Sequence, residues 1–173
     1  MDSMRFLHLA FLLLLSFGLL EAKAPGSDKI SDYIFDHLDT IGTLEKDKYG
    51  FVYVKIDDDF IYKLYELIQD QGFKPPPYFG GVEMHGAHIS VIYSGESDHY
   101  RIGDIEEVGS KIKFSCKECE IVHPKNWHGV TDAYTITVDA PSLQKLRKKY
   151  GLPKAAHNFH ITIGIKRESG KAA

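Results

Sequence analysis

Two short motifs in the chain place a hydroxyl two residues after an imidazole. They are His88-Ile89-Ser90 and His160-Ile161-Thr162, and no other histidine among the nine is followed in this way. An imidazole, with an unperturbed pKa of about 6.5, can take up or release a proton near neutral pH. A hydroxyl can donate a hydrogen bond to an anionic oxygen. Two such sets in one cleft would suit the hydrolysis of a phosphodiester without a metal, because one ring activates water and the other protonates the departing oxygen.

Both motifs lie in apolar, β-branched stretches, over residues 87–93 and 159–165, which predicts two strands. Side chains alternate along a strand, so His88 and Ser90 should share one face, with Ile89, Val91 and Tyr93 on the other. The same alternation should put the imidazole and the hydroxyl of the second motif together. If the two strands face each other, two rings and two hydroxyls converge on one cleft.

The elements that would position these strands occur in the same order twice. Strand, helix, loop and histidine-bearing strand follow one another over residues 51–93 and again over 133–165. This order predicts a single α+β domain over residues 25–166, with duplicated lobes related by approximate two-fold symmetry around a central cleft. Residues 167–173 are expected to form a disordered tail.

The remaining elements follow from apolar periodicity and from breaker residues. Glycines at 42, 72 and 151 are expected to end the helices, and the acids at 57–59 to stabilise a helix N-terminus. We expect helices over 27–41, 57–71 and 141–150, strands over 51–56, 111–122 and 133–138, and a polar loop after the strand at 87–93.

The paired motifs, 72 positions apart and flanked by apolar residues, resemble those of the 2H phosphoesterase superfamily. This superfamily includes the LigT-like RNA 2′,3′-cyclic phosphodiesterases. The resemblance covers most of residues 51–165. It implies that His88 and His160 form the acid–base pair, that Ser90 and Thr162 bind phosphate, and that no metal or other cofactor takes part. It also implies a small nucleotide or an RNA end as substrate, without deciding which one or which histidine is the acid.

Aromatic side chains in two loops are candidates for stacking on a base. Tyr78 and Phe79 follow three prolines and precede two glycines, in a semi-rigid loop long enough to fold over a site. Trp127 lies in a second, mixed polar loop. Local packing is the alternative for all three residues.

The N-terminus has the layout of a secretory signal peptide. Residues 6–20 are almost entirely apolar, a single basic residue precedes them, and small residues follow at 22 and 24. We therefore expect cleavage near residues 22–24 and a mature protein that is secreted or otherwise extracytosolic, in the secretory pathway or a periplasm. An uncleaved membrane anchor is the alternative. After cleavage we expect a monomer with no membrane-spanning segment.

The charge balance limits the class of ligand. With 21 basic and 24 acidic residues the net charge is −3, which does not suit a bulk nucleic-acid binder. Residues 141–173 are nevertheless basic, with eight lysines and arginines and one acid. This end of the chain would attract a phosphorylated ligand, or it would simply be a solvated helix face.

The sequence leaves two other functions possible. One is a non-catalytic secreted module that binds phosphate or RNA ends without turnover. The other is a redox or metal-binding domain built on Cys116 and Cys119 or on His85 and His88. The two cysteines lie three positions apart in a predicted strand, about 10 Å in extended chain, too far for a disulfide unless a bulge intervenes. The histidine pair lacks a third ligand at regular zinc spacing.

Overall fold

Alternating apolar residues build two antiparallel sheets, and helices pack between and around them in an α+β arrangement. The computed structural model describes residues 23–77, 84–125 and 127–168. The expected signal peptide therefore lies, apart from its last two residues, outside the described residues. In the part of the chain that is described, no helix is both long and apolar enough to cross a bilayer.

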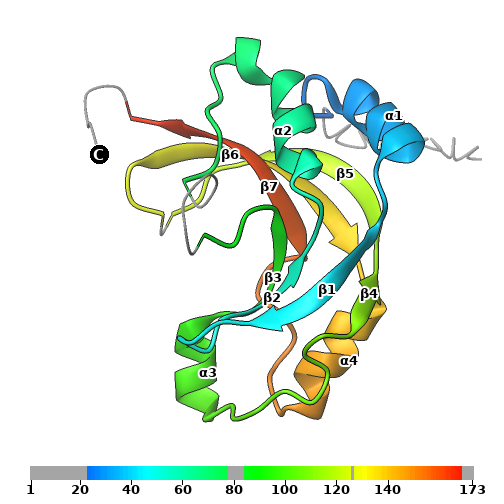
Figure 1. The fold of residues 1–173 in the computed structure, drawn as a ribbon. Helices are drawn as coiled ribbons and strands as arrows, with labels where there is room; N and C mark the ends of the chain where they lie inside the picture. Colours follow the sequence, from blue (N-terminus) through cyan, green and yellow to red (C-terminus); the bar gives the residue numbers. More distant parts are fainter. Residues whose placement is uncertain (1–22, 78–83, 126, 169–173) are drawn as a thin grey trace, which may run out of the picture.

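The first sheet has the strand order β3-β2-β1-β4, and the second has the order β5-β6-β7. The first sheet consists of β1 (Ile41–Lys46), β2 (Val52–Lys55), β3 (His88–Ile92) and β4 (Lys111–Lys113). The second sheet consists of β5 (Ser115–Val122), β6 (Val130–Asp139) and β7 (His160–Arg167). The two histidine-bearing strands, β3 and β7, are edge strands of different sheets and lie against each other (Figure 1).

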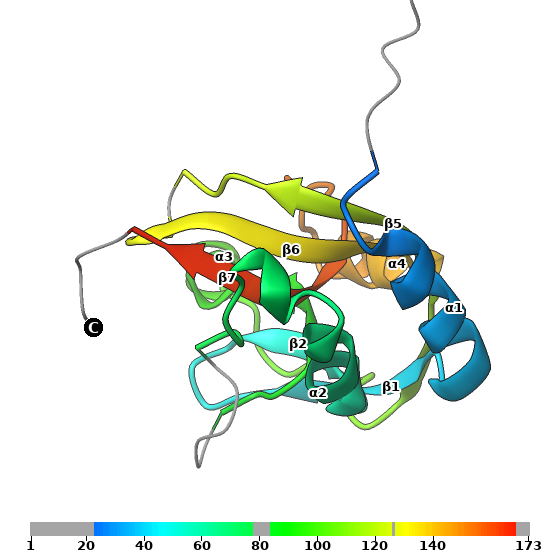
Figure 2. The same cartoon turned by 90° about the horizontal axis from the view of Figure 1, so that it is seen from above.

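The described helices are α1 (Ser27–His37), α2 (Asp59–Glu66), α3 (Ser94–Tyr100) and α4 (Pro141–Lys149), with a 3₁₀ turn over Gln69–Gln71. Helix α2 follows β2 of the first sheet but packs on β7 of the second. Helix α4 follows β6 of the second sheet and packs on β3 of the first. Seen from above, β5, β6 and β7 form one layer and β1 and β2 the other (Figure 2). Each sheet thus supplies a helix to a histidine-bearing strand of the other.

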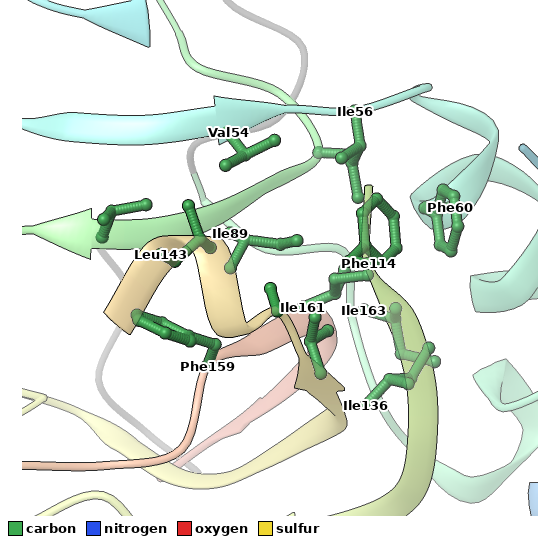
Figure 3. Close-up of a cluster of buried hydrophobic side chains, with 14 of the residues drawn as sticks. Val54, Ile56, Phe60, Ile89, Phe114, Ile136, Leu143, Phe159, Ile161 and Ile163 are labelled. Carbon is green, nitrogen blue, oxygen red and sulfur yellow. The ribbon is translucent and has the colours of Figure 1, made fainter. Parts of the chain in front are cut away.

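The isoleucines of the two motifs form the centre of the core. Ile89, Ile161 and Ile163 are completely buried and point toward one another together with Val54 and Ile136 (Figure 3). Burying an isoleucine side chain contributes about 1.5–3 kcal/mol. Because neighbouring side chains on a strand point to opposite faces, this burial turns the histidines to the side of the sheets away from the core. The predicted alternation around both histidines is confirmed.

The alternation is interrupted in β7 by a register shift between Thr162 and Gly164, and beyond β3 it fails at Tyr93. This residue was expected on the face opposite His88, but it is half exposed and lines the same cavity as His88. Strand β3 ends at Ile92, and Tyr93 is the N-cap of α3, so its side chain no longer follows the strand period.

The segment after α2 lies closely against β7. Lys74 and Ile165 exchange two backbone hydrogen bonds of 2.8 Å. A Cβ at Gly164 would lie 2.8 Å from a methyl group of Ile68 and 3.1 Å from the Cβ of Phe73. Glycine at this position therefore permits the close approach of the chain on the core face of β7.

The expected helix over 27–41 is too long. Helix α1 ends at His37, and Gly42 lies inside β1 instead of capping a helix. A Cβ at Gly42 would lie under 3.0 Å from Val54 and from the Lys55 carbonyl, so glycine there allows β1 and β2 to pack. The helix expected over 57–71 is also wrong in length, because α2 ends at Glu66 and continues only as a 3₁₀ turn. Gly72, in the left-handed region with a φ of 84°, ends that turn as expected.

Two further expectations about the middle of the chain are wrong. The stretch 111–122 is not one strand but two, in different sheets, with the buried Phe114 between them. The stretch after β3 is not only loop, since it contains α3. The backbone N–H of Tyr93 bonds the carboxylate of Glu96 at the start of this helix.

Glu96 is itself fixed by the buried residue Arg147 of α4. The guanidinium donates two hydrogen bonds to the Glu96 carboxylate, at 2.6 and 3.1 Å, and one of 2.6 Å to the Val91 carbonyl. It donates a fourth to the Pro153 carbonyl. These hydrogen bonds lower the pKa of Glu96 against the opposing effect of its partial burial. Arg147 thus joins α4 to the end of β3 and to α3.

Candidate active site

Both motif histidines line one cavity of about 1130 Å³ on the side of the sheets away from the core. Thr162 and Trp127 line it as well, so four of the predicted site residues come together. Other residues around the cavity were not predicted from the sequence as site residues, among them Phe51, Lys125, Thr135, Thr137 and Asn158.

The two rings are oriented by the same kind of hydrogen bond. Nδ1 of His88 lies 2.8 Å from the Gly86 carbonyl, and Nδ1 of His160 lies 2.9 Å from the Asn158 carbonyl. A carbonyl oxygen only accepts, so Nδ1 must donate in both rings. Nε2 is then the atom of each ring that gains or loses a proton.

His88 is poised to be neutral at neutral pH. Its pKa is lowered to about 4, mainly by burial and in part by the charges of His85, Lys55 and His160, against the opposing effect of the hydrogen bond to the Gly86 carbonyl. Among these causes is the charge of His160, which places the second ring within electrostatic range of the first.

Aromatic rings form the wall around His88. Phe51 and Tyr53 present edge contacts to the imidazole, with centroids 5.6 and 5.7 Å away. The Tyr53 hydroxyl donates a 2.7 Å hydrogen bond to Glu45. Burial and this carboxylate raise the pKa of Tyr53, so its hydroxyl keeps its proton.

The hydroxyls are distributed unevenly between the two motifs. Thr162 is buried in the cavity wall, opposite Thr135 of β6. Ser90 lies opposite Tyr53 of β2, is half buried, and is not among the residues that line the cavity. Two threonines of β6 donate to carbonyls of β5, at 3.4 Å from Thr135 and 3.2 Å from Thr137.

Of the predicted stacking residues, Trp127 lies at the cavity, while Tyr78 and Phe79 lie outside the described residues. Tyr93 and Phe51 add aromatic surface that was not expected there, with rings stacked 6.0 Å apart. Alternation could not identify them, because one follows the end of β3 and the other precedes β2.

The cysteines have the properties of structural thiols. Cys116 and Cys119 are both free, and β5 changes register between them. Burial raises the pKa of Cys116 to about 12 and that of Cys119 to about 11. A reactive cysteine needs an accessible thiolate, so these values disfavour a redox role. Among the described residues, no three or more histidine, cysteine or acidic side chains are grouped to hold a metal ion.

A comparison with known families agrees with this arrangement. The family model described as 2H-SAK, Swiss Army Knife, 2H phosphoesterase domain, matches residues 52–169. The match begins with β2 and includes both motifs and every strand from β2 to β7. No curated protein and no solved structure matches the chain.

Proposed function

The chain belongs to the 2H phosphoesterases, and on that basis we propose that it hydrolyses 2′,3′-cyclic phosphates or related RNA and nucleotide phosphodiesters by two-histidine acid–base catalysis. The observation that carries the proposal is the convergence of His88, His160 and Thr162 on one cavity. Family membership supports a phosphoester hydrolase; the substrate and the roles of the residues are our inference.

In the proposed reaction water attacks phosphorus while one ring removes its proton. His88 is the better base, because the low pKa of about 4 keeps it unprotonated at neutral pH. His160 in its protonated form then delivers a proton from Nε2 to the ribose oxygen that leaves. A P–O bond to water forms, the P–O bond to one ribose oxygen breaks, and the product is a phosphomonoester with a free hydroxyl.

The charge that builds on the non-bridging oxygens needs hydrogen-bond donors. Thr162 is the first candidate, since it shares the cavity with both rings. Ser90 stays a prediction as a second donor, because its position opposite Tyr53 does not bring it to the cavity lining. Trp127 is the described candidate for stacking on the base.

Turnover of a 2′,3′-cyclic mononucleotide in the presence of EDTA tests the proposal directly. We expect a phosphomonoester product, detected by mass spectrometry, at a rate that the chelator does not change. A short RNA ending in a cyclic phosphate should be tested in parallel, because the cavity is larger than a single phosphate requires. Binding of either ligand without product would favour the non-catalytic alternative.

The pH dependence of kcat/KM should reflect His88. A base with a pKa of about 4 stays unprotonated at all higher pH values, so we expect activity to persist down to about pH 4 and to fall below it. Unfolding should be followed at each pH, because protons bind more readily to this histidine in the unfolded chain. That difference lowers stability as the pH falls from about 6.5 toward about 4. An acid limb near pH 6.5 in folded protein would contradict the assignment of His88 as base.

Gly86 connects the fold to the catalytic geometry. Its carbonyl orients His88, its φ is 62°, and a Cβ there would lie under 3.0 Å from Lys55 and Asp58. We expect Gly86→Ala to lower kcat/KM strongly and the free energy of unfolding only slightly, because the collision moves the carbonyl that fixes the His88 ring.

Gly109→Ala is the matched control for this variant. Gly109 has a φ of 88° and no neighbour within 4 Å, so an alanine there meets only the cost of the left-handed conformation, about 1–2 kcal/mol. The two variants should be compared by steady-state kinetics and by thermal unfolding. Equal kcat/KM in both would show that the carbonyl does not position His88.

We also infer that the two lobes arose by duplication. The order of two strands, helix and histidine-bearing strand occurs in both, and both rings donate Nδ1–H to the carbonyl two residues earlier. Export as a monomer, after removal of residues up to 22–24, is likewise part of the proposal. N-terminal sequencing of the protein from its native source, with light scattering, would test it.

A further inference from the structure

Each motif histidine is preceded, three positions earlier, by another histidine that lines the same cavity. His85 stands before His88, and His157 before His160. The two outer rings differ in their surroundings. His157 is exposed, whereas the His85 side chain is only 26% exposed and its Nε2 lies 3.1 Å from a carboxylate oxygen of Asp47.

Asp47 is held in place by backbone amides, independently of its contact with His85. Its Oδ1 accepts hydrogen bonds from the amides of Tyr49 and Phe51, at 2.8 and 2.9 Å, in the turn between β1 and β2. Its Oδ2 is the oxygen that faces His85. Burial raises the pKa of Asp47, but the two amides and His85 together lower it, so the carboxylate is ionised.

The ring of His85 is enclosed by aromatic side chains next to the proposed base. Tyr53 and Phe51 contact it edge-on, with centroids 4.6 and 5.0 Å away. The centroid of His88 lies 5.7 Å from it. His85 is thus packed into the cavity wall on one side and held by an ionised carboxylate on another.

We propose that His85, held by Asp47, is a further substrate-contacting residue, whose protonated ring binds a non-bridging oxygen of the phosphate that lies between His88 and His160. This inference rests on the proposed function. A ring that donates Nε2–H to Asp47 has Nδ1–H available for an anion, and a charge-assisted bond of this kind is about twice as strong as a neutral one.

The asymmetry of the two motifs favours this role. On the β7 side the cavity contains His160 and the hydroxyl of Thr162, but on the β3 side Ser90 is not in the lining. His85, together with Tyr93, lines the cavity on that side, and its ring contacts that of His88. It supplies the donor that the first motif does not place there.

Among the described residues, the acidic side chain that contacts the His85 ring is that of Asp47. Tyr53 keeps its proton, and the Glu45 carboxylate accepts from that hydroxyl. His88 is neutral above about pH 4, and the ammonium of Lys55 is paired with Asp58.

His85→Gln tests the inference by separating KM from kcat. We expect KM for a 2′,3′-cyclic nucleotide to rise about tenfold or more at pH 5.5, with little change at pH 8, because only a protonated ring makes the charge-assisted bond. The acid limb set by His88 should also move to higher pH, since the charge of His85 opposes protonation of His88. A merely structural role would move neither quantity in this way.

Three further variants complete the experiment. His85→Lys keeps a cation and should retain low KM at both pH values, whereas Asp47→Asn keeps an acceptor for the two amides and should weaken binding as His85→Gln does. His157→Gln removes the exposed ring, for which the described part of the chain supplies no carboxylate partner, and should raise KM less. Equal KM profiles for wild type and His85→Gln, or equal losses for the variants at 85 and 157, would overturn the proposal.

Inorganic phosphate provides a test that does not depend on turnover. At pH 5.5 we expect phosphate to shift the His85 ring resonances of wild type and to bind about tenfold more weakly to His85→Gln. If wild type binds phosphate through His85 but hydrolyses no cyclic phosphate, the proposed function fails while this site stands. If phosphate binds both proteins equally, the site fails whatever the activity.

Discussion

Removing either motif imidazole is expected to lower the turnover of a 2′,3′-cyclic nucleotide by about 10²–10⁴-fold, the usual contribution of a positioned acid or base. His88→Ala removes the proposed base and His160→Ala the proposed acid. The two losses should not add in the double variant, because residues that act as a unit are strongly non-additive. Initial rates in EDTA, with product quantified by chromatography, give the measurement.

His99→Ala is the control for these variants. His99 lies on the exposed surface of α3 and touches only the ring of Tyr100 among the described aromatic contacts. It should retain wild-type kcat/KM. Circular dichroism and thermal unfolding establish that each variant is folded. Undiminished turnover in both motif variants would reject the proposed chemistry, and retained ligand binding without turnover in wild type would favour the non-catalytic module.

The largest expected effect on stability follows from Arg147. Arg147→Met is expected to lower the free energy of unfolding by about 3–5 kcal/mol, because it removes the cation and two of the hydrogen bonds of the Glu96 carboxylate and the side-chain donor of the Val91 carbonyl in a largely buried place. The Arg147 side chain is 2% exposed, so water cannot replace the lost hydrogen bonds without local opening. Urea unfolding of wild type and variant measures the difference.

Lys149→Met, on the same helix, is the matched control. Lys149 pairs with Glu106 and Glu107 at 2.7 Å, but its side chain is 46% exposed, so its loss should change stability much less. The double variant Arg147→Met with Glu96→Gln should recover part of the loss, since it removes the uncompensated charge. A change at Arg147 as small as that at Lys149 would contradict the role we give it.

The contribution of the Arg147–Glu96 ion pair to the free energy of unfolding should decrease as the pH falls. The pKa of Glu96 is lowered in the folded state, so the unfolded chain binds the proton more readily. The contribution of the pair is therefore present above the pKa of an unfolded glutamate, about 4.3, and is lost as the pH falls through the folded value. The difference in stability between wild type and Arg147→Met should narrow over that range.

The sequence predicted which faces of the two histidine-bearing strands are buried better than it predicted where helices and strands begin and end. Local alternation was enough to separate the faces of β3 and β7, because burial of Ile89 and Ile161 decides the orientation of their neighbours. It was not enough for Tyr93, which lies just beyond the end of a strand. Nor could it show that Ser90 would lie opposite Tyr53 and away from the cavity lining, since strand pairing is not a local property.

The errors in secondary structure have a common physical origin in long-range contacts. Glycine commonly ends a helix, so Gly42 was expected to do so. It lies inside β1 instead, because a larger residue there would collide with Val54. Helix α3 depends on Glu96, which Arg147 fixes from another part of the chain. The sequence showed His85 as part of an H-x-x-H pair with His88, but only the turn that positions Asp47 distinguishes it from His157.

The exchange of helices between the two sheets has a consequence for how the protein folds. Because α2 covers β7 and α4 covers β3, a fragment ending after α3 would leave the apolar face of β3 open to water, and the complementary fragment would leave that of β7 open. We therefore expect neither fragment to be autonomous and denaturation to occur in one concerted step. The proposed acid–base pair, which takes one histidine from each part, would then be assembled only in the complete native state.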